Sequence, residues 1–145
     1  MDFIETVEKF IWGKNPIILG GDFNTDLEVE VPDELDAYKL ITEDCEFIDT
    51  YALVGICQID TTDLAPSCCK DYGHPGCTYA VLLENKYAIN PFTGDPGDPM
   101  RIDYIFIKGG HIVTKESTVV FNSDSNWVSD HSGVLTKIGL FPPTY

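Results

Sequence analysis

The sequence predicts an α/β fold, on the evidence of two kinds of segment in a chain of moderate size. Short apolar runs bounded by Pro or Gly, at residues 17–19 and 101–107, are typical of β-strands. Apolar residues at helical spacing, at residues 2–13 and 32–43, predict helices. The chain has 145 residues, of which 43% are hydrophobic and 12% aromatic. This size and composition suit one domain with its own core.

The N-terminal part is predicted to form a helix, a strand and a second helix. Residues 2–13 show an amphipathic pattern, which Asn15-Pro16 ends. The apolar run at 17–19 then predicts a buried strand closed by two glycines. Residues 32–43 predict the next helix, because Pro32 suits a first helical turn and the acids after it suit the positive end of the helix dipole.

The rest of the chain alternates loops with β-prone runs. Residues 47–56 indicate a short helical or extended segment, and residues 78–83 indicate a strand. Segments 60–76 and 90–99 are dense in Pro, Gly and Asp, which predicts long loops of the kind that often carry function. Three further strands are predicted at 101–107, 111–121 and 133–140.

The charge of the chain limits its partners. The net charge is −15, from 24 acidic and 9 basic residues, and Arg101 is the only arginine. Broad contact with nucleic-acid phosphates normally leaves a surface rich in Lys and Arg, so nucleic acid is the less favoured partner. Eleven carboxylates and one lysine lie between Asp22 and Asp49. They indicate a solvated acidic face or a region that attracts divalent cations.

The sequence shows neither a membrane span nor a secretory signal. No apolar run approaches the roughly eighteen residues that a span needs, and residues 1–8 are acidic. The default expectation is therefore a cytoplasmic protein. Five cysteines, an odd number, argue against a complete disulfide framework. Between Cys68 and Cys77, where His74 also lies, one local disulfide or reduced thiols are favoured over a metal site.

Gly20-Gly21-Asp22-Phe23-Asn24 carries the first candidate site residues. On an extended backbone, residues i and i+2 point to the same side. Asp22 and Asn24 would then stand side by side at the end of the strand, with Phe23 turned into the core. A carboxylate beside an amide suits a phosphate or a metal-bound water. The alternative is a polar turn without function, because short motifs often occur by chance.

The other candidates are Asp103, in a strongly β-prone run, and His131, in Ser129-Asp130-His131. Alternation places Asp103 on the strand face that carries isoleucines, where a carboxylate without a partner is costly. Its partner is either Arg101, in a structural salt bridge, or a catalytic histidine that it orients. Asp130 and His131 are adjacent in the sequence, so both can serve one site only if they lie in a turn.

Three motifs in order resemble the endonuclease/exonuclease/phosphatase superfamily: Gly-Asp-Phe-Asn at 21–24, Arg-Ile-Asp-Tyr-Ile at 101–105 and Ser-Asp-His at 129–131. The resemblance spans nearly the whole chain. Arg-Ile-Asp-Tyr-Ile-Phe after a Pro/Gly-rich loop is most similar to the neutral sphingomyelinases. The resemblance implies a four-layered α/β/β/α sandwich, with mostly antiparallel sheet flanked by helices, and a Mg²⁺-dependent phosphodiesterase.

The resemblance also implies a role for each candidate residue. His131 matches the general base toward the attacking water, and Asp103 matches the carboxylate that holds this histidine. Asn24 matches the amide that hydrogen-bonds a phosphate oxygen. Asp22 matches a carboxylate that positions the water or assists the leaving group, and Asp130 matches an acid near the metal.

The chain departs from the family pattern at its N-terminal side. The family's first-strand Asn, its metal-binding Glu and a further catalytic His or Tyr have no counterpart before the helix at 2–13. We therefore expect residues 1–145 to form a single partial domain, the C-terminal half of the fold. The missing N-terminal half would come from another chain or a longer gene product, and one apolar sheet face would be left uncovered.

Three functions are open at this point. The leading one is hydrolysis of a phospholipid phosphodiester at a membrane surface, of the sphingomyelinase C type, with Mg²⁺ and His131 activating water. The alternative enzyme is a metal-dependent nuclease on the same scaffold, against which the negative charge counts. The third is a non-catalytic fragment that binds a partner through its exposed sheet face, because the metal-binding Glu has no counterpart.

Overall fold

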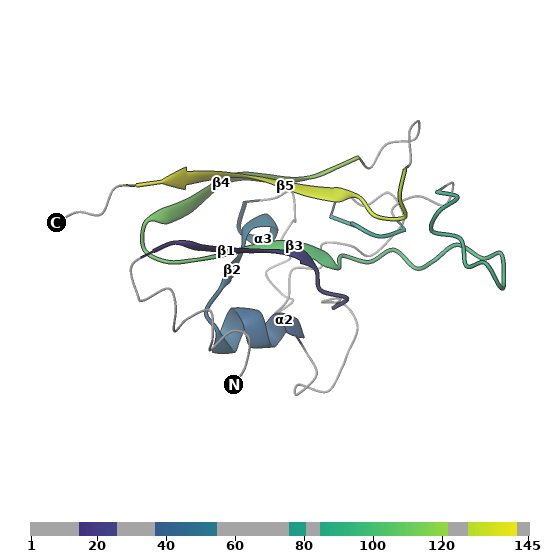
Figure 1. Cartoon of the computed structure of the whole chain (residues 1–145), viewed down its shortest axis with the longest axis horizontal. Helices are drawn as coiled ribbons and strands as arrows, with labels where there is room; N and C mark the ends of the chain where they lie inside the picture. Colours follow the sequence, from purple (N-terminus) through teal and green to yellow (C-terminus); the bar gives the residue numbers. More distant parts are fainter. Residues whose placement is uncertain (1–14, 26–36, 55–75, 81–84, 122–127, 142–145) are drawn as a thin grey trace, which may run out of the picture.

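The computed structural model describes residues 15–25, 37–54, 76–80, 85–121 and 128–141 (Figure 1). These residues form, in order, β1 (Ile17–Asp22), α2 (Ala37–Lys39), a π-helical turn η2 (Leu40–Asp44), β2 (Ile48–Asp49), α3 (Thr50–Val54), β3 (Asp103–Lys108), β4 (Ile112–Val120) and β5 (Gly133–Leu140). Short helices with mostly antiparallel strands confirm the predicted α/β class.

The strands form two antiparallel sheets. Within the described residues, β3 is the central strand of one sheet, with β1 and β2 on either side, and β4 pairs with β5 in the other. The register of β1 and β3 sets Gly20 opposite Ile105 and Asp22 opposite Asp103. In Figure 1 the β4–β5 sheet lies on one side of β3 and α2 lies on the other. The described elements therefore stack as sheet, sheet and helix.

The apolar core lies between β3 and the α2–η2 segment. Tyr104 and Phe106 of β3 are buried there with Ile41 and Phe47. Phe23 turns into this core as predicted, and its ring meets that of Phe106 edge-on with 5.3 Å between centroids. Alternate residues of a strand face opposite sides, so the residues between these aromatics face the β4–β5 sheet instead. Asp103, the candidate carboxylate of β3, lies on this side, toward the β4–β5 sheet.

A chain of hydroxyl groups joins β3 to the β4–β5 sheet. The hydroxyl of Thr50, at the start of α3, donates to the carbonyl of Ile105 at 2.8 Å. Its Oγ1 also lies 2.9 Å from that of Thr136 in β5, which in turn lies 2.8 Å from Oγ of Ser117 in β4. Thr50 is fully buried. Because buried hydroxyls need partners, these hydrogen bonds fix how the two sheets pack on each other.

The C-terminal strands lie where they were predicted. β3, β4 and β5 fall within one or two residues of the ranges 101–107, 111–121 and 133–140. Residues 47–56 contain both of the alternatives considered, since β2 is extended and α3 is helical. The helix predicted at 32–43 is present from Ala37 to Asp44.

Other predictions need correction or lie outside the described residues. β1 is a strand, but it is not buried: Ile18 is 56% exposed, because β1 is at the edge of its sheet. Tyr79 makes only isolated bridges, to Met100 and His131, and residues 78–80 belong to none of the strands. The helix at 2–13, residues 32–36, most of the loop at 60–76 and residues 81–84 lie outside the described part.

The expectations about membrane spans and about the cysteines can be compared with the described residues. None of their helices is long and apolar enough to cross a membrane. Cys77 is buried and disulfide-bonded, so it is neither a thiol nor a metal ligand. Its partner and residues 68–75 of the run lie outside the described residues.

Candidate active site

A cleft of about 330 Å³ opens where β1 and β3 meet the start of β5. None of the described residues that line it is basic. They are Gly20, Gly21, Asp22, Asp103, Tyr104, Ile105, Ser132, Gly133 and Val134. Space is open where a Cβ of Gly21 would stand. The glycines therefore leave room over β1 for a molecule bound beside the acids.

Asp22 and Asp103 lie directly opposite each other in the pairing of β1 with β3. Opposite residues of an antiparallel pair have Cβ atoms about 5 Å apart, and like charges at this spacing destabilise the pair. The arrangement therefore favours a positive charge close to both carboxylates.

Asp103 is hydrogen-bonded to His131. Its Oδ2 lies 2.8 Å from Nδ1 of the histidine, and the two side chains are 20% and 27% exposed. The alternative of a salt bridge from Arg101 to Asp103 is wrong, because Arg101 pairs with Asp49. A carboxylate at Nδ1 favours the tautomer with its proton there, which leaves Nε2 as the basic atom.

The Ser-Asp-His segment forms a bend, as the adjacency of its residues requires. Oγ of Ser129 accepts from the backbone N–H of His131 at 3.1 Å and donates to Asp130 at 3.2 Å. The buried side chain of Asn85 donates to the carbonyl of Ser129 at 3.2 Å. The centroid of the Tyr79 ring lies 5.2 Å from that of the His131 imidazole. These contacts hold the imidazole in one place beside the cleft.

The acids around His131 raise its pKa. Partial burial lowers the pKa of the imidazole, but the hydrogen bond that it donates to Asp103 and the charges of Asp103, Asp130 and Asp22 outweigh this effect. The net pKa lies above the usual value for histidine. A larger fraction of His131 is therefore protonated at neutral pH than for an exposed histidine, and the basic form becomes available as pH rises through this pKa.

Asp103→Asn is expected to lower the pKa of His131, because the amide keeps the shape of the side chain but removes its charge. The measurement is an NMR titration of the imidazole in the metal-free chain, assigned with His131→Ala. Asp22→Asn is the matched control, since Asp22 contributes only through its charge, and it should lower the pKa less. An unchanged pKa in Asp103→Asn would contradict the ion pair seen here.

Asn24 does not continue the extended strand. β1 ends at Asp22, and Asn24 has a φ of 49°, in the left-handed region that Asn tolerates better than most residues. Its backbone N–H donates to Oδ1 of Asp22 at 2.9 Å, which closes an Asx turn. Asn24 is not among the lining residues of the cleft. The predicted strand geometry is wrong here, while the role of the Asn24 amide toward phosphate stays a prediction.

The described residues do not form a metal centre by themselves. Among them, no group of three or more His, Cys, Asp or Glu side chains could hold a metal ion. Asp22, Asp103 and Asp130 surround His131 closely enough to affect its pKa, but they do not converge as ligands. Mg²⁺ usually takes one or two carboxylates and several waters, so a site for this ion does not require three such side chains. The assignment of Asp130 to a metal site stays a prediction.

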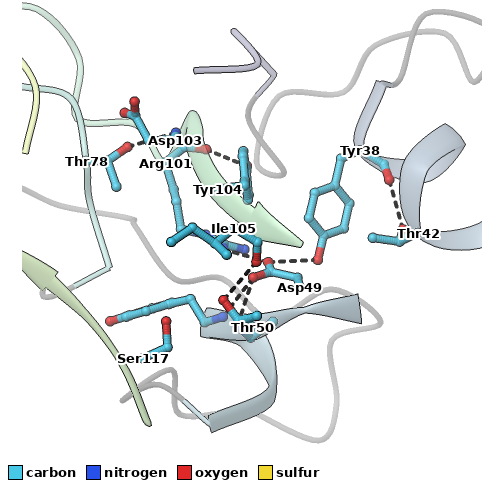
Figure 2. A network of polar contacts seen from close by, with 12 residues as sticks. Tyr38, Thr42, Asp49, Thr50, Thr78, Arg101, Asp103, Tyr104, Ile105 and Ser117 are labelled. Carbon is cyan, nitrogen blue, oxygen red and sulfur yellow. Dashed lines mark hydrogen bonds and ion pairs between the residues drawn. The ribbon is translucent and has the colours of Figure 1, made fainter. Parts of the chain in front are cut away.

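Arg101 is buried behind the site against α3. Its Nη1 lies 2.6 Å from Oδ2 of Asp49, and the two side chains are 2% and 3% exposed. Asp49 also accepts from the hydroxyl of Tyr38 and from the backbone N–H groups of Tyr51 and Ala52. Figure 2 shows Asp49 at the centre of these contacts. The guanidinium is therefore committed to the fold and does not face the cleft.

Sequence reasoning missed two residues that support the site, Thr78 and Asn85. Both are buried, with 0% and 1% of their surface exposed, and both bond to segments that carry the candidate residues. Thr78 begins a predicted strand and Asn85 follows it, and a single polar residue in either place does not differ from a solvated neighbour.

A family model described as the Endonuclease/Exonuclease/phosphatase family matches residues 2–131. No curated protein and no solved structure matches the chain. The matched range contains Asp22, Asp103 and His131.

Proposed function

Because the chain belongs to the endonuclease/exonuclease/phosphatase family, we propose that its cleft is the site of a metal-dependent phosphodiester hydrolase. Members of this family are generally hydrolases of phosphoesters and commonly use divalent metal ions, often Mg²⁺. The observation that carries the proposal is the 2.8 Å contact between Asp103 and His131 beside an acidic cleft. A histidine held by a carboxylate is a typical general base for water.

In the proposed reaction His131 takes a proton from the attacking water through Nε2. Asp103 holds the ring and stabilises the imidazolium as it forms, and Asp22 faces the same position from β1. A bound divalent ion supplies charge stabilisation at the phosphate. We propose that its remaining ligands come from an N-terminal half of the fold, on another chain or in a longer form of this protein.

A phospholipid head group is the substrate class that we favour over nucleic acid. The single arginine is buried with Asp49, so no guanidinium is available to bind a phosphate backbone. Among the described residues, the cleft lining contains two carboxylates and no basic side chain. A sphingomyelin-like substrate presents one phosphate beside a quaternary ammonium, which carboxylates and the half-buried ring of Tyr79 can accept. The neutral sphingomyelinase type therefore suits the charges of the site.

We expect the protein to release phosphocholine from sphingomyelin in mixed micelles with Mg²⁺, to lose this activity in EDTA and to regain it when Mg²⁺ is restored. The assay compares the chain alone with the chain supplied with an N-terminal half of the fold, and we expect the second to be faster. Plasmid DNA at low salt is the competing substrate, because nucleic-acid binding is strongest there.

The outcomes of this assay separate the hypotheses. Faster turnover of plasmid DNA than of sphingomyelin would assign the site to a nuclease. No phosphoester cleavage by either form of the protein would contradict the hydrolase and leave a non-catalytic role.

A further inference from the structure

Residues 76–80 lie between the two segments that carry Asp103 and His131. On one side, the backbone N–H of Thr78 donates to the carbonyl of Met100 at 2.9 Å. On the other side, its carbonyl accepts from the N–H of Ser132 at 2.6 Å. Ser132 directly follows the histidine, so Thr78 bonds to both segments through its backbone alone.

The side chain of Thr78 adds bonds at the start of β3. Its Oγ1 lies 3.1 Å from the backbone nitrogens of both Ile102 and Asp103, which donate to it. Figure 2 shows this hydroxyl beside the first residues of the strand. Thr78 is fully buried and Ile102 is 5% exposed, so water is a poor substitute for the hydroxyl. The hydroxyl therefore fixes the backbone of the residue whose carboxylate meets the histidine.

Asn85, a further support of the histidine, acts on one side only. Asn85 bonds to Ser129 in the bend before His131, and none of its described bonds reaches β3. Thr78 bonds to both sides, at the amide of Asp103 and at the residue after His131. The separation of the carboxylate and the imidazole thus depends on this residue more than on Asn85.

We propose that Thr78 is the positioning residue of the site: it sets the distance between Asp103 and His131, so that the carboxylate meets Nδ1. Thr78 acts through these two side chains and is not among the residues that line the cleft. The catalytic meaning of this role rests on the proposed hydrolase function, whereas the positioning itself can be measured in the chain without substrate.

The test compares Thr78→Val, which removes the hydroxyl but keeps the volume, with Thr78→Ser, which keeps the hydroxyl. Thr50→Val is the matched control, because Thr50 is equally buried and its hydroxyl also bonds to β3, at Ile105. Thr50 makes no described bond to Asp103 or to residues 129–132; its other partner is Thr136, further along β5. A general loss of stability would affect both valine variants, whereas a loss of positioning would affect only Thr78→Val.

At fixed pH, we expect Thr78→Val to lose the downfield NMR signal of the hydrogen-bonded Nδ1–H of His131. We also expect the backbone amide hydrogen of Asp103 to exchange with solvent faster in this variant. In the active protein its kcat should fall by roughly 10-fold to 10²-fold with little change in KM, as for a misplaced catalytic group. Thr78→Ser should behave like the wild type. Thr50→Val should keep the signal and kcat although its Tm falls.

Retention of the Nδ1–H signal in Thr78→Val, or its equal loss in Thr50→Val, would overturn the proposal. If Thr78→Val does not fold, Thr78→Ala gives the same comparison without the added methyl group. Loss of the signal in Thr78→Val together with a wild type that cleaves no phosphoester would uphold the positioning role and reject the proposed function.

Discussion

His131→Ala is expected to lower kcat for phosphodiester hydrolysis at least ~10²-fold, which is the usual scale for the loss of a general base. The imidazole lies 2.8 Å from Asp103, which lines the cleft, so the variant removes the group that we propose takes the proton from the attacking water. KM should change little, because the ring acts on water rather than on the bound head group. The measurement is the initial rate of sphingomyelin hydrolysis with Mg²⁺.

His111→Ala is the matched control for this variant. His111 lies just before β4, where its backbone carbonyl accepts from Phe141, and unlike His131 it makes no described bond to an acid of the cleft. It should keep the wild-type rate. If His131→Ala retained that rate as well, with an unchanged Tm, the base would have to be a different group and the mechanism would be wrong.

The strands and the core could be predicted because their signal is local. A β-prone run such as 101–107 contains its own evidence, and β3 begins and ends within two residues of that range. The burial of Phe23 followed from its position between two polar residues at a strand end. That Asp103 has a partner followed from a different argument, since a carboxylate on an apolar face is costly alone. The family resemblance, and not this argument, pointed to His131 as that partner.

The partners themselves could not be chosen from the sequence. Arg101 is two residues from Asp103, yet it pairs with Asp49, which is 52 positions away. Spacing along a strand says which side chains share a face, but not which element is packed against that face. The geometry of Asn24 was missed for a related reason: the i and i+2 rule holds only while the strand continues, and the strand ends at Asp22.

Arg101→Met is expected to lower the free energy of unfolding by about 3–5 kcal/mol, the usual result when one partner of a buried ion pair is removed. The change leaves Asp49 charged and 5% exposed, with only Tyr38 and the N–H groups of α3 to stabilise it. The aliphatic part of Met can still pack against Tyr104, over whose ring the guanidinium lies at 4.6 Å. Urea unfolding of the oxidised chain measures the difference.

Lys137→Met is the control, because Lys137 pairs with Glu116 at 3.3 Å where the side chains are 63% and 73% exposed. Loss of this pair should lower the free energy of unfolding by less than ~1 kcal/mol.

The double variant Arg101→Met/Asp49→Asn should be more stable than Arg101→Met alone, since the introduced amide oxygen would still accept from the N–H groups of α3 without a buried charge. Nε and Nη2 of Arg101 have no hydrogen-bond partner among the described residues, so the hydrogen bonding of the buried guanidinium is incomplete there. If Arg101→Met were no less stable than Lys137→Met, the ion pair of Arg101 with Asp49 would not stabilise the fold.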